Sequence, residues 1–148
     1  MKRFLVAIDG SEGSDAAIDQ ALELAQDVGA QVTFAVVRRP PPSLFGNPYY
    51  ERLLSTELAK ARATIDTATN KALQVGVDAQ GEILEGDSVD EILSFADNRG
   101  ADLIVLGSRG RGAFAGALLG SVSSGVVQHA SVPVLVAKDR SGRQLVAA

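Results

Sequence analysis

Short apolar runs and helix-like patterns alternate along the whole chain. Five runs rich in Val, Ile, Leu and Phe, several of them closed by Gly, Asp or Ser, predict strands. The predicted strands are residues 4–8, 32–37, 77–84, 102–106 and 132–136. Between the runs, apolar residues recur at the spacing of an amphipathic helix. The predicted helices are one that ends at Gly29, one from about Tyr50 to Leu73, one from Ser88 that ends at Gly100, and one from about Ser121 to His129.

Three local patterns make this assignment more specific. The first helix is expected to bury one face, formed by Ala17, Ala21, Leu24 and Val28. The segment 88–91 has the S-x-x-E form of a capping box, which predicts Ser88 as the residue that caps the third helix. Pro133 lacks a main-chain N–H group, so the last strand is expected to be short or to lie at a sheet edge.

Alternation of strands and helices predicts an α/β fold, a Rossmann-like three-layer sandwich with helices on both faces of a parallel sheet. The 148 residues fit one domain, which we assign to residues 1–138, followed by a C-terminal tail at 139–148. Sheets of this kind bind ligands beyond the carboxyl ends of the strands, where the strand order reverses. The search for a site therefore begins at those ends.

Two loops of small residues follow predicted strands. Residues 9–14 read DGSEGS, and residues 107–112 read GSRGRG. If the first and fourth strands are neighbours, both loops line one crevice. The second loop leads to Gly120 and a helix start at Ser121, where free N–H groups and the helix dipole favour an anion. Neither a P-loop nor a strict G-x-G-x-x-G is present, so a phosphate site and an ordinary surface loop both remain open.

The composition excludes several classes of functional site and of binding partner. The chain has no cysteine and one histidine, which excludes disulfides, thiolate zinc sites and multi-histidine metal sites. The net charge of −4 is unlike that of a general nucleic-acid binder. We find no run long enough for a transmembrane helix, and the apolar start is too short for a signal peptide, so we expect a cytoplasmic protein.

Other polar groups have an ordinary interpretation beside a functional one. The acidic residues at 85–91 are expected to cap a helix and complement its dipole rather than to bind a metal. His129 is expected to be structural. Arg38, Arg39 and the prolines that follow lie near the expected crevice, where they either contact phosphates or form a solvated loop.

At this point the residues resemble a known family. The spacing of Gly107, Gly110, Gly120 and Ser121 matches the G-2x-G-9x-G-(S/T) motif of the ATP-binding branch of the universal stress protein family. The resemblance extends over nearly the whole chain. It includes VAIDGS at 6–11, EGD at 85–87, ADLIVLGSRGRG at 101–112 and HASVPVLV at 129–136.

The resemblance implies a five-stranded parallel sheet of order 3-2-1-4-5, a dimer, and an adenine nucleotide as ligand. Asp9 matches the family residue on the ribose or adenine side, and Ala7 lies where some members carry proline. Val37 matches the residue against the adenine, with Val36 as the alternative if the register slips by one. Leu106 and Gly107 would flank the base or ribose. The matches to the triphosphate cradle are Arg109, Gly110, Gly120, Ser121, Val122 and Ser123.

These observations favour a homodimeric protein that binds ATP, with Mg²⁺ on the phosphates, and acts as a nucleotide sensor in a stress response. Dimerisation is expected through the last strand, residues 132–136. The alternative is a slow ATPase or nucleotide hydrolase of the same fold, although no positioned general base is evident. A protein with a vestigial loop and no nucleotide is a third possibility, which the intact glycine spacing disfavours.

Overall fold

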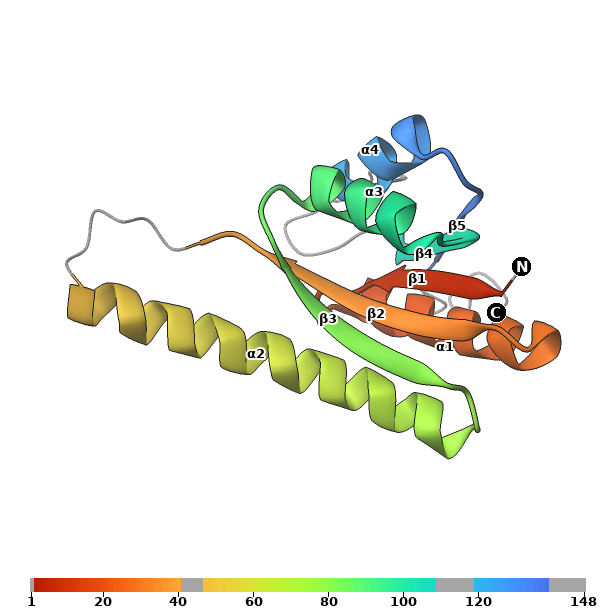
Figure 1. Ribbon diagram of the computed structural model, residues 1–148, viewed down its shortest axis with the longest axis horizontal. Helices are drawn as coiled ribbons and strands as arrows, with labels where there is room; N and C mark the ends of the chain where they lie inside the picture. Colours follow the sequence, from red (N-terminus) through yellow and green to blue (C-terminus); the bar gives the residue numbers. More distant parts are fainter. Residues whose placement is uncertain (1, 41–46, 109–118, 139–148) are drawn as a thin grey trace, which may run out of the picture.

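The computed structural model describes residues 2–40, 47–108 and 119–138. Within them the chain alternates between strands and helices, as Figure 1 shows. The strands are β1 (Arg3–Ala7), β2 (Gln31–Arg38), β3 (Ala79–Glu85), β4 (Leu103–Gly107) and β5 (Val134–Ala137). The helices are α1 (Glu12–Val28), α2 (Asn47–Gln74), α3 (Ser88–Arg99) and α4 (Ser121–His129).

The strands form one parallel sheet in the order β3-β2-β1-β4-β5, which confirms the predicted topology. β1 lies in the middle of the sheet, where Val6 aligns with Phe34 of β2 and with Val105 of β4. From β1, the chain adds β2 and β3 on one side of the sheet and then crosses over to add β4 and β5 on the other side. The order reverses between β1 and β4, which is where such folds bind their ligands.

Side chains of the central strands alternate between two cores, one on each face of the sheet. Phe4, Val6 and Phe34 pack with α1 and α2, whereas Leu5 and Ile104 pack with α3 and α4. All five side chains are almost completely buried. Strands buried on both faces read as continuous apolar runs, which explains why the sequence pattern located them.

The start of β1 is held by an acidic side chain of the segment before β4. The main-chain N–H groups of Lys2 and Arg3 donate to Asp102 Oδ2 at 2.8 and 2.9 Å. These two hydrogen bonds are the main reason why the pKa of Asp102 lies below its ordinary value of 3.8. The ionised carboxylate therefore fixes the first residues of the sheet.

Helix α1 ends as predicted and buries two of the four expected residues, Ala17 and Ala21. Gly29 terminates it in the left-handed conformation, with φ of 72°. Leu24 is only half-buried and Val28 is exposed, contrary to the expected face. The buried residues are Gly13, Ser14, Ala17, Ile18, Ala21, Leu22 and Ala25. Small residues dominate this face because α1 lies close against the sheet.

Helix α3 begins at Ser88, as predicted, but a different residue caps it. Asp87, not Ser88, is the N-cap, and its Oδ2 accepts a hydrogen bond from the N–H of Asp90 at 3.1 Å. Asp and Ser are both good caps, so the sequence offered two adjacent candidates. Helix α3 ends at Gly100, as predicted.

The last strands shift by one or two residues from the pattern. β3 starts at Ala79 rather than Val77, and β4 covers 103–107 rather than 102–106. β5 starts at Val134, after Pro133, whose carbonyl already accepts from Ile104 N at 3.0 Å. With four residues at the sheet edge, β5 confirms what the proline predicted.

Helix α2 is much longer than the strands it covers. Its 28 residues span about 42 Å, against about 23 Å for the seven residues of β3. Figure 1 shows its first half projecting beyond the end of the sheet. The second half packs closely, and a Cβ on Gly81 of β3 would collide with the Ile65 side chain. In the part of the chain that the structure describes, neither α2 nor a shorter helix has an apolar stretch that could cross a membrane.

Candidate functional site

The carboxyl ends of β1 and β4 lie side by side, as the two small-residue loops require. Beyond the ladder, Ile8 N donates to Ala35 O of β2 at 2.9 Å, and Ser108 N donates to Ala137 O of β5 at 2.8 Å. The loop after β1 and the loop after β4 therefore leave the same edge of the sheet. This edge is the reversal point of the strand order.

In the first loop, the carboxylate of Asp9 is fixed by its neighbours. Its Oδ1 accepts from the Ser14 hydroxyl at 2.7 Å and from Ser11 N at 2.9 Å. Asp9 N in turn donates to Ser14 Oγ at 2.7 Å. Ser11 also caps α1 through its side chain. Asp9 thus has the turn role expected of a strand-end residue, and its carboxylate is held in one orientation at the sheet edge.

Gly107 lets the two loops approach each other at the level of the backbone. A Cβ at this position would lie 2.5 Å from the Gly13 carbonyl oxygen and 3.0 Å from its Cα. No other residue type fits this contact without movement of the main chain. The end of β4 and the start of α1 are therefore packed backbone against backbone.

The base of the second loop is closed by hydrogen bonds on the Ser108 carbonyl oxygen. Gly120 N donates to it at 2.7 Å, and the Ser123 hydroxyl donates to it at 2.9 Å. Ser123 is buried, and its hydroxyl also lies 3.1 Å from Gly120 O. The hydroxyl expected to donate to phosphate is directed to main-chain carbonyls instead. Ser121, the first residue of α4, is exposed.

The N-terminus of α4 differs from those of α1 and α3. Ser11 and Asp87 cap the latter two with their side chains, whereas Gly120 provides no side-chain cap for α4. The first N–H groups of a helix have no partner within the helix. Those of Ser121 and Val122 thus carry the positive end of the helix dipole toward the crevice edge. Arg109 and Gly110, which the motif also assigns to the cradle, lie outside the described residues.

Four apolar site candidates share one side of the sheet. Ala7, Val37, Leu106 and Val122 all pack in or against the core under α3 and α4. Val36 belongs to the opposite core, so the alternation of β2 places Val37 with the other candidates. Ala7, Val37 and Val122 are half-buried, and Leu106 is buried. Together they provide an apolar floor at the carboxyl ends of β1, β2 and β4.

The acidic segment after β3 confirms the capping interpretation and adds ion pairs. Asp87 caps α3 and lies 3.2 Å from Arg39, while Glu85 lies 3.2 Å from Arg38. Both arginines of the crevice rim are therefore paired with this segment. Arg38 is mostly covered, and its Nε and Nη1 lack partners among the described residues. No group of three or more His, Cys, Asp or Glu residues suited to a metal occurs in the described ranges.

Two residues that support the site were missed in the sequence. Ser14 orients Asp9, and Ser108 provides the carbonyl that closes the second loop. Both side chains are buried polar groups. Their signal was available, because each follows a strand end within a few positions. A serine near a strand end or a helix start is so common, however, that spacing alone does not distinguish these two from the others.

Comparison with known proteins identifies the family of the chain. A family model, the universal stress protein family, matches residues 1–138. Universal stress protein YxiE of Bacillus subtilis is 34% identical over 145 residues, covering 92% of this chain and 98% of that protein. A universal stress protein of Thermus aquaticus is 35% identical over 137 residues, covering 93% and 98%.

Solved structures of the same family have the same fold. Universal stress protein UspA from Lactobacillus plantarum superposes with a TM-score of 0.82 at 28% identity, covering 92% of this chain and 97% of that one. A universal stress protein in complex with cAMP has a TM-score of 0.74 at 27% identity, covering 93% and 97%. The protein from Archaeoglobus fulgidus in complex with dAMP has a TM-score of 0.69 at 25% identity, covering 93% and 98%. The chain therefore belongs to the universal stress protein family.

Proposed function

We propose that this protein binds an adenine nucleotide, ATP in particular, at the carboxyl edge between β1 and β4. The observation that carries the proposal is the convergence there of the Asp9 turn, the Gly107 contact and the uncapped start of α4. Relatives of the same fold have been solved with cAMP and dAMP, which supports an adenine nucleotide as the class of ligand.

Each part of the nucleotide has a matching surface in this arrangement. The adenine lies on the apolar floor of Ala7, Val37 and Leu106, which excludes water from one face of the base. The Asp9 carboxylate, already oriented by Ser14, accepts hydrogen bonds from the ribose side. Ordered acceptors of this kind favour binding because little freedom is lost when the ligand arrives.

The phosphates are assigned to the N-terminus of α4. The N–H groups of Ser121 and Val122, the exposed Ser121 hydroxyl and the dipole of α4 stabilise negative charge. Arg109 and Gly110 complete the cradle by the motif. Ser123 supports it indirectly, because its hydroxyl closes the loop on the Ser108 carbonyl. Mg²⁺ would be carried by the phosphate oxygens, as is usual for ATP, which needs few protein ligands.

The role that follows is binding rather than turnover. A protein that binds ATP and does not turn it over would report or sequester the nucleotide, which suits a sensor in a stress response. A homodimer through β5 fits this role. β5 is an edge strand with half-buried Val134, Leu135 and Val136, and Val127 of the adjoining α4 is 45% exposed.

The test is calorimetry of the intact chain with ATP, AMP and cAMP, with and without Mg²⁺. Asp and Asn are both good N-caps, so Gly120→Asp and Gly120→Asn should both fold. Only the aspartate adds a negative charge beside the phosphates, which costs about 1–4 kcal/mol at 4 Å. We expect the affinity for ATP to fall much more in Gly120→Asp than in Gly120→Asn.

Two outcomes would contradict the proposal. If the wild type binds none of the three nucleotides, the site assignment fails. If both Gly120 variants bind ATP like the wild type, the phosphates lie elsewhere. Phosphate release measured on the same samples addresses the role, because sustained release above a protein-free control would make the protein an ATPase.

A further inference from the structure

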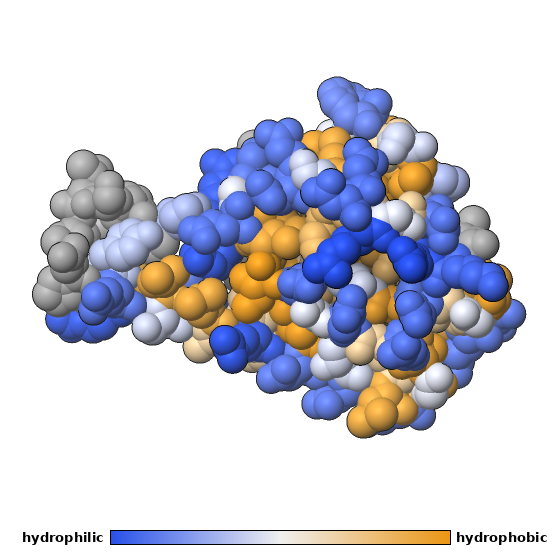
Figure 2. Space-filling model, viewed as in Figure 1, coloured by the Kyte–Doolittle hydropathy of each residue, from blue (hydrophilic) through white to orange (hydrophobic). Residues whose placement is uncertain are grey.

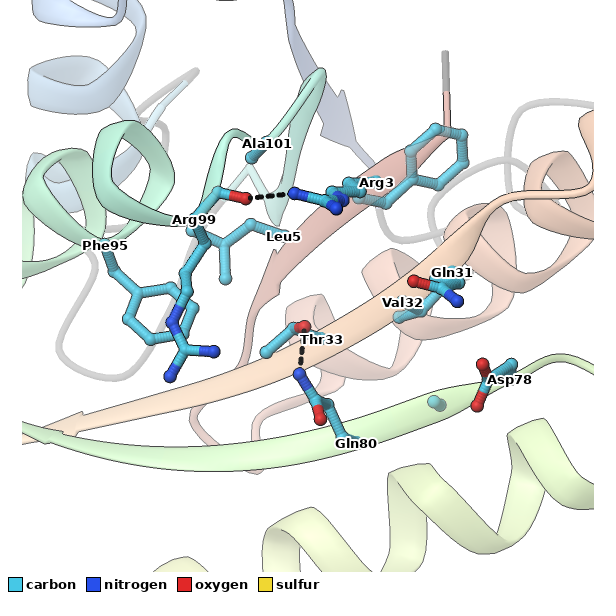
Figure 3. Close-up of a pocket in the computed structure, with 12 residues that line it drawn as sticks. Arg3, Leu5, Gln31, Val32, Thr33, Asp78, Gln80, Phe95, Arg99 and Ala101 are labelled. Carbon is cyan, nitrogen blue, oxygen red and sulfur yellow. Dashed lines mark hydrogen bonds between the residues drawn. The ribbon is translucent and has the colours of Figure 1, made fainter.

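A second hollow lies at the opposite end of the sheet from the nucleotide site. Figure 3 shows it over the first residues of β1, β2 and β3 and beside the end of α3. Its volume is about 350 Å³, within the range of pockets that hold small ligands. Leu5 and Ala101 contribute apolar lining, and the sheet is uncovered here because α3 ends at Arg99. The face that contains it is the one seen in Figure 2, where strongly hydrophilic residues cross the middle of the surface above the strands.

Two guanidinium groups line this hollow. Arg3 extends across it, and its Nη1 donates to the Arg99 carbonyl oxygen at 3.2 Å (Figure 3). Among the described residues, no carboxylate lies within ion-pair distance of the Arg3 guanidinium. Arg99 lies over the Phe95 ring, 5.0 Å from its centre, and its Nη2 lies 3.3 Å from Glu82. A guanidinium has five N–H donors, so each arginine keeps donors beyond these contacts.

Uncharged hydrogen-bonding groups line the hollow between the arginines and the sheet. The Gln80 amide donates to the Thr33 hydroxyl at 3.4 Å, and both side chains rise from adjacent strands beneath the arginines (Figure 3). The one acidic side chain among the lining residues is Asp78, on the far side from Arg99 (Figure 3). Arg3 and Arg99 thus bring positive charge to one side, where Glu82 pairs with Arg99 and Asp102 accepts from the Arg3 main chain, and Asp78 brings a negative charge to the other side.

We propose that this hollow binds a small molecule with an anionic head, a carboxylate or a phosphate group. The head pairs with the guanidinium groups of Arg3 and Arg99, which match planar or tetrahedral oxyanions with parallel donors. Thr33 and Gln80 hydrogen-bond the adjoining part of the ligand. Asp78 disfavours a second negative group, so the remainder of the molecule is uncharged or cationic.

This site is separate from the one proposed for the nucleotide. The strand pairs Arg3–Gln31 and Val32–Ala79 begin the sheet, whereas the nucleotide site lies beyond the last residues of the same strands. The two assignments also rest on different residues. A test of one can therefore fail while the other stands.

The experiment is a two-dimensional amide NMR titration of the full chain with inorganic phosphate and, separately, with acetate. Sodium chloride at matched ionic strength is the reference. We expect saturable shifts at Arg3, Thr33, Gln80 and Arg99 with at least one of the two anions. The response to each anion distinguishes the two kinds of head group.

Variants connect those shifts to the guanidinium groups. Arg3→Gln and Arg99→Gln should each weaken binding about tenfold or more, as expected when a charge-assisted hydrogen bond is lost. Arg62→Gln removes the same charge from an exposed position on α2 and should leave the binding unchanged. Thermal melts identify any variant that fails to fold. If one of Arg3→Gln and Arg99→Gln does not fold, the other provides the test.

Three results would overturn the proposal. The first is the absence of a saturable shift with either anion. The second is that Arg62→Gln weakens anion binding as much as Arg3→Gln and Arg99→Gln do. The third is that the shifts are confined to residues 120–123. The last would show that phosphate binds at the start of α4, in agreement with the nucleotide site. ATP titrations of the same variants keep the two proposals apart, because the hollow variants should retain nucleotide binding.

Discussion

Replacement of Gly107 by alanine is the most direct test of how the two loops are held together. The new Cβ would lie 2.5 Å from the Gly13 carbonyl oxygen and 2.6 Å from its carbonyl carbon. Ordinary contacts begin near 3.4 Å, so β4 and the start of α1 must separate by about 1 Å. Overpacking of this kind typically lowers the free energy of unfolding by about 1–3 kcal/mol.

Urea denaturation followed by circular dichroism measures that loss, and a melt should show a fall in Tm of about 2–4 °C per kcal/mol. Gly81→Ala is the matched control, because it is also a strand glycine but faces the Ile65 side chain. Adding Ile65→Ala to Gly81→Ala should restore stability, because it removes the side chain that the new Cβ meets. Adding Ile65→Ala to Gly107→Ala should restore none, because the new Cβ there meets main-chain atoms. ATP affinity should fall in Gly107→Ala, because the crevice widens.

The reasoning would be refuted by a Gly107→Ala variant whose unfolding free energy lies within about 0.5 kcal/mol of the wild type. That result would mean that the backbones at this edge yield without cost. The packing of Gly107 on Gly13 would then have no part in shaping the site.

Three further changes test other parts of the structure. Ser123→Ala should lower the unfolding free energy by about 0.5–1.5 kcal/mol, because the Ser108 carbonyl loses one of its two donors and keeps the Gly120 N–H; equal urea midpoints would contradict the loop closure. Asp102→Asn should be less stable than the wild type, by a margin that is constant above about pH 5 and shrinks as the pH falls below 3.8, since the lowered pKa of this carboxyl stabilises the fold only while it is ionised. Melts across that pH range check this, and a margin independent of pH would rule it out. Val134→Asp should convert a dimer to a monomer by light scattering, and an unchanged mass would exclude β5 as the interface.

The sheet order and the site edge were predictable because they depend on strong, redundant signals. Buried parallel strands are continuous apolar runs, and the loops at 9–14 and 107–112 stand out by their small residues. The resemblance to the family added the order of the strands. The structure then confirmed that the carboxyl ends of β1 and β4 are neighbours.

Finer details failed where two residues compete for one role. Asp87 and Ser88 are both good caps, and the geometry of the turn, not the composition, selects Asp87. On the predicted face of α1, Ala17 and Ala21 are buried, whereas Leu24 is half-buried and Val28 is exposed near the end of the helix. The sequence position of Ser123 cannot show that the Ser108 carbonyl lies 2.9 Å from its hydroxyl.

The length of α2 has a consequence for how this protein tolerates change. The first half of α2 projects beyond the sheet, whereas the second half places Ala61, Ala68 and Ala72 in the core and Ile65 against Gly81. Whole turns added or removed in the projecting half would leave the register of the packed half intact. We therefore expect this segment to accept changes of length, and a reporter or a fused domain attached there should leave the packed half undisturbed.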